Sequence, residues 1–194
     1  MKIKIDNLTI TVESSNPVKT DLKTSTVLME KTNLKRQNIN NNLIRIKMKS
    51  DNSIDSSVSF DIKELVKLFK YFFESESKYY KYTTSYEKTC FDLLKSDDSE
   101  TYCLFDEGFK NILACVVIKR KSYTNEPDDA IRIRMLVTNQ KHQKKGYATE
   151  CLKFAENLAI DANKYKMRVR VFVENTKAYT LYKKYGFKEI KRYK

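Results

Sequence analysis

Two short segments in the last third of the chain hold the residues whose types could do chemistry, and the first is QKKGYA at residues 143–148. It follows an expected strand and opens an expected helix, so its backbone amides are the unpaired donors of a first helical turn. A helix dipole favours an anion at that end, and Gly146 allows the backbone to approach a ligand closely. Lys141, Lys144 and Lys145 add positive charge. The segment predicts a phosphate-binding loop; the alternative is an ordinary glycine-containing loop before a helix.

The second segment is residues 175–187, which read N-x-x-A-x-x-x-Y-x-x-x-G-F. At every specified position this pattern resembles a motif of the GNAT superfamily of N-acetyltransferases. Residues 143–148 are similar to the same family's Q/R-x-x-G-x-G/A signature, which holds the pyrophosphate of coenzyme A between a strand and a helix. The resemblance covers about residues 101–190. Gln140 stands where many members have proline, and Ala148 replaces the commoner second glycine, but a cradle of backbone groups depends little on these side chains.

The resemblance implies an N-acetyltransferase with acetyl-CoA as cosubstrate and no metal. It places the pantetheine arm in a gap where the strand ending at residues 136–138 splays from the strand at residues 166–173. An amine is expected to attack the thioester directly there, with a backbone N–H near Leu136 or Val137 facing the oxyanion. The residues implied in binding acetyl-CoA are Leu136, Val137, Thr138, Gln143, Lys144, Lys145, Gly146, Tyr147, Ala148, Thr149, Asn175, Ala178 and Tyr182.

Tyr182 is implied as the catalytic acid that protonates the departing thiolate of CoA. A phenol of pKa about 10 giving its proton to a thiol of about 8.5 is uphill by about 2 kcal/mol, so we expect donation as the C–S bond breaks. The alternative is a helix tyrosine packed under the sheet. Tyr179 and Tyr185 lie on neighbouring helix faces and are weaker candidates.

The sequence leaves the general base open. An amine of pKa about 10 must lose a proton before it attacks. Some family members place a base in the strand that corresponds to residues 131–138, but this stretch contains no Asp or Glu. Asp128, Asp129 and Glu174 are the nearest carboxylates, and a solvated loop charge is the alternative role for each.

Hydrophobic periodicity predicts the elements that position these residues. Apolar residues recur at helical spacing over residues 62–76, and Glu64 follows Asp61 as in a capping box. We expect further helices at about 86–95, 146–163 and 176–185, and strands at 43–48, 101–105, 112–119, 130–137 and 166–173. Alternating strands and helices near the end imply a parallel element in the sheet, hence an α/β (α+β) domain. The resemblance implies the GNAT fold, a central mixed, mostly antiparallel sheet splayed between its fourth and fifth strands with flanking helices.

The first 42 residues match nothing in the family pattern. Residues 3–12 alternate apolar and polar types on both sides of Asp6-Asn7, which predicts a hairpin. Residues from about 13 to 42 are polar without a sustained period and are expected to be loop-rich. We therefore divide the chain into an N-terminal extension, residues 1–42, and a GNAT domain, residues 43–194.

Charge is concentrated near the end of the chain. The net charge is +13, and residues 131–194 carry 17 Lys or Arg against 5 Asp or Glu. Such a surface suits a polyanion, either a phosphorylated cosubstrate or nucleic acid. The competing hypothesis is a catalytically silent GNAT-like module that binds nucleic acid through this region. For the enzyme, substrate choice is expected in residues 63–95. The basic balance favours a peptide or protein amine, or an amine carried on RNA, over a polyamine or an aminoglycoside.

Cysteine usage and hydropathy exclude other classes. The four cysteines form no C-x-x-C pair, and one histidine, His142, cannot complete a zinc set, so we expect buried reduced thiols. No stretch approaches about 18 apolar residues, and no apolar signal region follows the N-terminus. The expectation is an intracellular, cytoplasmic protein without a membrane segment; the oligomeric state is left open.

Overall fold

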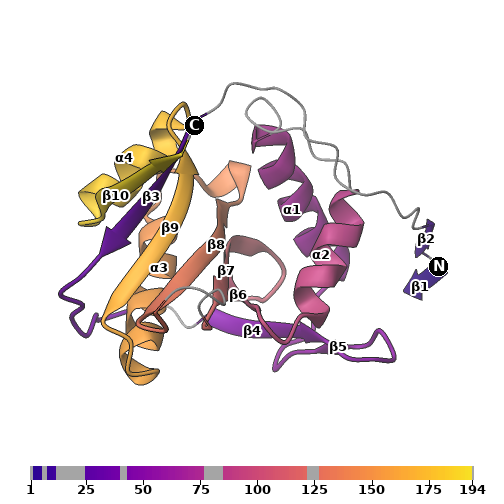
Figure 1. Cartoon of the computed structure of the whole chain (residues 1–194). Helices are drawn as coiled ribbons and strands as arrows, with labels where there is room; N and C mark the ends of the chain where they lie inside the picture. The colour runs from indigo at the N-terminus through magenta and orange to yellow at the C-terminus, as the bar shows by residue number, and fades with distance from the viewer. Residues whose placement is uncertain are drawn as a thin grey trace.

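The computed structural model describes residues 2–5, 8–11, 25–39, 43–76, 85–121 and 127–193. Within these residues an eight-stranded sheet runs in the order β10-β3-β9-β8-β7-β6-β4-β5 (Figure 1). Its strands are β3 (Thr26–Lys31), β4 (Leu43–Met48), β5 (Ile54–Asp55), β6 (Glu100–Phe105), β7 (Ile112–Lys119), β8 (Ala130–Thr138), β9 (Lys166–Phe172) and β10 (Lys188–Tyr193). All neighbours pair antiparallel except β8 and β9, which are parallel. The sheet is therefore mixed and mostly antiparallel, as predicted.

Helices cover both faces of this sheet (Figure 1). They are α1 (Ile62–Glu76), α2 (Tyr86–Lys95), α3 (Tyr147–Asp161) and α4 (Thr176–Lys184), with a short 3-10 helix, η1 (Gln140–His142). The apolar stripe of α1 is buried as its spacing predicts, and α1 and α2 share one hydrophobic cluster with the sheet. Residues of α3 and α4 belong to the cluster on the other face. Because β7 lies between these two layers, its run ILACVVIK is apolar almost throughout rather than alternating.

A β-bulge in β8 determines where the sheet opens. Val117 of β7 pairs with Met135 and Ile118 pairs with Ile133, so Arg134 is an extra residue without an opposite partner on β7. Ile133 packs in the cluster under α3, whereas Met135 packs in the cluster under α1. The bulge therefore turns the apolar residues that follow it toward the opposite face of the sheet. It lies where pairing with β9 ends, at Ile133 and Val169.

The predicted splay is therefore present between β8 and β9, which correspond to the fourth and fifth strands of the family pattern. Strand β8 continues to Thr138 and β9 to Phe172, beyond their last shared pair. In this part of β8, the backbone groups that face the gap do not pair with β9. This opening positions the candidate site.

The expectation that residues from about 13 to 42 are loop-rich is wrong for residues 26–31. These form β3, which pairs with β9 on one side and β10 on the other. Val27, Leu28 and Met29 are consecutive and all buried, because an inner strand has both faces covered. An alternating pattern is absent for that reason. Strand β10 was also not predicted. It is almost wholly exposed and has few apolar residues, so it can be recognised as a strand only from its pairing with β3.

The predicted N-terminal hairpin is present. Strand β1 (Lys2–Ile5) pairs antiparallel with β2 (Leu8–Thr11), and Ile5 is opposite Leu8. The turn residues Asp6 and Asn7 lie outside the described residues.

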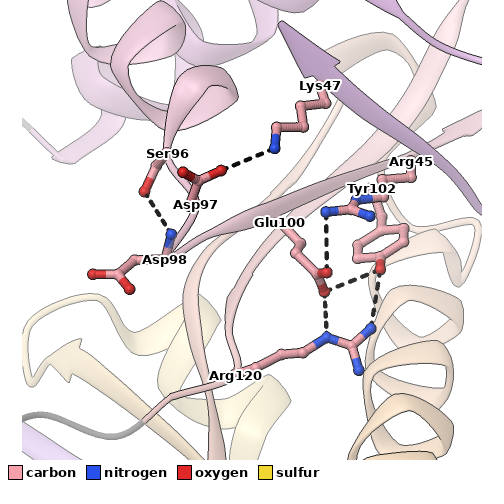
Figure 2. A network of polar contacts seen from close by, with 8 residues as sticks. All are labelled: Arg45, Lys47, Ser96, Asp97, Asp98, Glu100, Tyr102 and Arg120. Atoms are coloured by element: carbon pink, nitrogen blue, oxygen red, sulfur yellow. Dashed lines mark hydrogen bonds and ion pairs between the residues drawn. The ribbon is translucent and has the colours of Figure 1, made fainter. Parts of the chain in front are cut away.

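A polar network links β4, β6 and Arg120, the residue that follows β7 (Figure 2). Glu100 of β6 receives hydrogen bonds from the Arg120 guanidinium and the Tyr102 hydroxyl, and it forms an ion pair with Arg45 of β4. Burial raises the pKa of Tyr102, which keeps its hydroxyl protonated as a donor. The Tyr102 ring contacts Phe154 of α3 with 4.8 Å between ring centroids. The network fixes α3, whose first turn belongs to the site, against β6.

The four cysteines are buried free thiols, as expected. Burial raises the pKa of Cys90, Cys115 and Cys151, so these thiols are poor nucleophiles. No helix in the described part of the chain is both long and apolar enough to cross a membrane.

Candidate active site

The gap between β8 and β9 opens into a cleft of about 760 Å³. Its walls come from the end of α1, the second half of β8, the loop before α3, β9 and the first turns of α4. Segments from distant parts of the sequence therefore meet at this one opening of the sheet.

The loop before α3 has the geometry expected of an anion cradle. Lys144 has φ 62° and Gly146 has φ 86°, so the chain turns through two left-handed residues just before the helix. Gly146 occupies the N-cap position and offers no capping side chain to the first amides of the 15-residue helix. A Cβ atom added at Gly146 would meet no atom within 4 Å and would project into open space. The first-turn amides of α3 are therefore accessible to a ligand phosphate.

Most residues implied in binding acetyl-CoA line this cleft. They are Leu136, Val137, Thr138, Gln143, Lys144, Gly146, Tyr147, Ala148, Thr149, Asn175, Ala178 and Tyr182. Lys145 is an exposed loop residue and does not line it. Within the described residues, the fold thus brings all but one of these side chains to the same cavity.

Gln143 also connects the loop to α1. Its side-chain amide donates a hydrogen bond of 2.8 Å to the Tyr71 hydroxyl. Tyr71 lies in residues 63–95, where substrate choice is expected; residues 77–84 of that region lie outside the described residues. The bond places α1 beside the loop that precedes α3.

Tyr182 is the tyrosine of α4 that reaches the cleft. Its side chain is 5% exposed, and its ring stands edge-on to Phe187 with centroids 5.5 Å apart. Burial, and to a smaller extent the nearby charge of Glu76, raises the pKa of Tyr182 well above its ordinary value, so the phenol stays protonated. Tyr179 instead donates to Glu189 and Tyr185 donates to Glu156, and neither lines the cleft.

The carboxylates considered from the sequence as bases are not in the cleft. Asp128 pairs with Lys164 at 2.6 Å. Asp129 pairs with Lys166 at 2.9 Å just before the first residue of β8, at the opposite end of the strand from Thr138. Burial alone would raise the pKa of Asp129, but its cationic neighbours hold that pKa below the ordinary value. Glu174 is likewise absent from the cleft lining.

Sequence reasoning missed Glu76, the last residue of α1, which is 7% exposed and lines the cleft. Its Oε1 accepts a hydrogen bond of 2.6 Å from Nδ2 of Asn175. Oδ1 of Asn175 accepts the Ala178 N–H at 3.2 Å and so caps α4. Nothing in the local sequence marks Glu76, since it reads as the polar end of an amphipathic helix.

Comparisons with known proteins agree with this fold and site. The family model described as acetyltransferase (GNAT) family matches residues 62–187. The chain therefore belongs to the GNAT acetyltransferase family, whose members are acetyl-CoA-dependent N-acetyltransferases. A search of curated proteins found no match.

Solved structures support the fold at low sequence identity. A ribosomal-protein-alanine N-acetyltransferase from Brucella melitensis biovar Abortus 2308 is 16% identical, with a TM-score of 0.53 over 65% of this chain and 85% of that one. An aminoglycoside N-acetyltransferase in complex with CoA is 13% identical, with a TM-score of 0.57 over 83% and 96%. A functionally unknown conserved protein from Staphylococcus epidermidis is 15% identical, with a TM-score of 0.57 over 87% of this chain, which spans 59% of that longer one.

Proposed function

We propose that this chain transfers the acetyl group of acetyl-CoA to a primary amine of a peptide or protein, by direct attack within a ternary complex. One observation carries the proposal: the uncapped first turn of α3, the open side of β8 and the Tyr182 ring line one cleft. This arrangement offers an anion cradle, free backbone groups and a proton donor to the same bound molecule.

The chain's own groups have separable tasks in this proposal. Acetyl-CoA supplies the activated acyl group. The amides at the start of α3 hold its pyrophosphate, helped by Lys144. A backbone N–H near Leu136 or Val137 faces the oxygen that becomes negative as the amine attacks, and one preorganised donor of this kind contributes about 3 kcal/mol.

Tyr182 protonates the leaving thiolate. Its hydroxyl forms no hydrogen bond with another residue in the described part of the chain, so it remains available to the sulfur. The raised pKa makes a full proton transfer before bond cleavage more unfavourable than for an ordinary phenol. Donation is therefore coupled to breakage of the C–S bond.

The charge of the cleft supports a peptide or protein amine as acceptor. Among the described residues that line it, four are cationic and one is acidic. The cations suit the phosphates of CoA, but they oppose an acceptor with several positive charges. A peptide amine carries one positive charge and is repelled least.

A screen of amines with detection of free CoA thiol tests the proposal. The panel contains a tripeptide with a free α-amine, an N-blocked peptide with one lysine, spermidine and kanamycin. We expect thiol release with at least one of the two peptides above the rate without acceptor. No release with any amine would overturn the proposed function, and release with spermidine or kanamycin alone would overturn the peptide assignment.

A further inference from the structure

Two of the four cations that line the cleft lie where β8 and β9 separate. Ile133 of β8 and Val169 of β9 are the last residues that pair, and the two strands are parallel. Arg134 and Arg170 are the next residue on each strand, so one arginine lies on each side of the point where the gap begins. Both side chains are exposed. The closed end of the gap therefore carries two guanidinium groups.

Both arginines are positioned by neutral groups. Nη1 of Arg134 donates a hydrogen bond of 2.7 Å to the hydroxyl of Ser99, which is 5% exposed. Cζ of Arg170 lies 4.3 Å from the centre of the Tyr193 ring, a contact that orients a guanidinium and leaves its charge in place. Within the described residues, neither arginine forms an ion pair with a carboxylate. The two positive charges therefore remain available to a ligand.

Arg168, two residues before Arg170 on β9, has different partners. Its guanidinium forms ion pairs with Glu30 at 2.7 Å and with Asp129 at 3.2 Å. It lies in the part of β9 that still pairs with β8. Carboxylates of this chain thus compensate the arginine in the paired part of the strands, whereas the described residues provide none to the two arginines at the start of the gap.

The phosphates of CoA are expected at the other end of the gap. Lys144 in the loop before α3 and Lys177 in the first turn of α4 are the cations near the starts of these helices. From Thr138, at the end of β8, back to Arg134 is four residues of strand, about 13 Å at about 3.3 Å per residue. A pantetheine arm that follows the open side of β8 from the phosphate cradle therefore directs its thioester toward Arg134. The acceptor amine has to reach the same place.

We propose that Arg134 and Arg170 bind a carboxylate of the acceptor, so that the acceptor is a peptide or protein amine with an acidic residue next to the reacting one. The inference rests on the proposed function and deepens it, since it names the class of peptide. Guanidinium groups match the planar geometry of a carboxylate and bind it through paired hydrogen bonds. An acidic side chain also offsets the positive charge of the acceptor ammonium, so the cations of the cleft repel such a peptide less.

The test uses two peptides that differ only beside the reacting amine. In the peptide of the panel that the wild type acetylates fastest, with its C terminus amidated, either aspartate or asparagine is placed next to the reacting residue. These two side chains have nearly the same shape, and only aspartate is charged at neutral pH. We expect the wild type to favour the aspartate peptide by about tenfold or more in kcat/KM.

Arg134→Gln and Arg170→Gln should each reduce this preference by about threefold or more, and the double variant should abolish it. Each variant is measured with both peptides, because a general loss of folding or activity lowers both rates and leaves their ratio unchanged. Arg36→Gln is the matched control. Arg36 is 58% exposed, pairs with Asp161 and does not line the cleft, so its substitution removes one positive charge and should keep the wild-type preference.

The affinity for acetyl-CoA, measured by titration, distinguishes the acceptor from CoA as the ligand of the two arginines. We expect it to be unchanged in Arg134→Gln and Arg170→Gln. A loss of this affinity with an unchanged peptide preference would assign the arginines to the phosphates of CoA and overturn the inference. Equal kcat/KM of the wild type with both peptides would also overturn it and leave the proposed function intact. If the wild type acetylates no peptide of the panel, the proposed function fails and the inference fails with it.

Discussion

At the scale of single residues, a substitution of Tyr182 tests the proposed chemistry most directly. Its ring is buried against Phe187, so Tyr182→Phe removes one hydroxyl and keeps the packing. We expect the single-turnover rate of acetyl transfer to fall by about 10²-fold to 10⁴-fold, with the affinity for acetyl-CoA nearly unchanged. A single turnover is the proper measurement because product release can mask a slower chemical step in kcat.

Tyr179→Phe is the matched control, because its hydroxyl donates to Glu189 away from the cleft. It should leave the single-turnover rate unchanged. If Tyr182→Phe also transfers at the wild-type rate, another group or water protonates the thiolate.

Gly146 tests the phosphate cradle. With φ 86° and open space at the Cβ position, Gly146→Asp would adopt a strained backbone and project a carboxylate beside the amides of α3. The strain of a left-handed residue costs about 1–2 kcal/mol of folding stability. We expect a loss of acetyl-CoA affinity well beyond that cost, measured by ligand titration beside a denaturant melt.

Gly186→Ala separates strain from the loss of binding. Gly186 has φ 98° and does not line the cleft, so its substitution introduces the same kind of strain elsewhere. It should lower stability and leave acetyl-CoA affinity intact. Equal losses of folding and affinity in Gly146→Asp would make Gly146 a structural glycine only.

Residue patterns predicted most of the residues that line the cleft but not Glu76. The segments at 143–148 and 175–187 are local in sequence, and their spacing alone indicates a loop before a helix and a helix face. Glu76 becomes part of the cleft only because α1 packs across the opening and Asn175 reaches it, a contact over 99 residues of sequence separation. Hydrophobic periodicity along one helix contains no information on such a contact.

At the scale of elements, the bulge and the inserted strand were beyond sequence reasoning for different reasons. Residues 130–137 read as one continuous strand, and the change of face at Arg134 depends on the register with β7. β3 lacks alternation because both faces are covered, and β10 lacks apolar residues. The helices α1 and α2 were predicted within their observed bounds because one face of each is buried and the other exposed.

The inserted strand β3 predicts that residues 25–39 are integral to the fold rather than part of an extension. Removing residues 1–36 would expose β9 and take Lys31 and the Lys35 N–H from the fully buried Glu156. Leaving a buried charge without its partner costs about 3–5 kcal/mol, and losing the apolar burial of Val27, Leu28 and Met29 adds about 1.5–3 kcal/mol for each. Since whole domains are stable by about 5–15 kcal/mol, we expect no cooperative thermal transition.

A chain beginning at Ser25 is the control, because it retains β3, and it should melt cooperatively. The point variant Met29→Ala keeps the strand and should cost about 2–5 kcal/mol. Ile190→Ala on β10, where the side chain is 50% exposed, should cost well under half of that. A folded chain lacking residues 1–36 would show that β3 is dispensable.

At the scale of the whole molecule, only part of the positive charge lies at the cleft. Four cations line the cavity, whereas Lys166 and Arg168 are engaged with Glu30 and Asp129 at the far end of the strands. The excess of positive charge in residues 131–194 is therefore not one continuous surface of free side chains. Composition could not distinguish these uses, because ion pairs with β3 appear only in the folded chain.

This distribution leads to a last prediction, that acetyl-CoA stabilises the fold more than nucleic acid does. A ligand that binds only the native state adds RT ln(1 + [L]/Kd), about 2.7 kcal/mol at a hundredfold excess over Kd. For a chain of this size that corresponds to a rise in Tm of about 5–10 °C. Because the cleft encloses its ligand, the rise should persist at high salt, whereas stabilisation by a single-stranded oligonucleotide should fall steeply as salt increases. A thermal melt unchanged by millimolar acetyl-CoA but raised by the oligonucleotide would contradict the proposed activity and favour a binding module on the same fold.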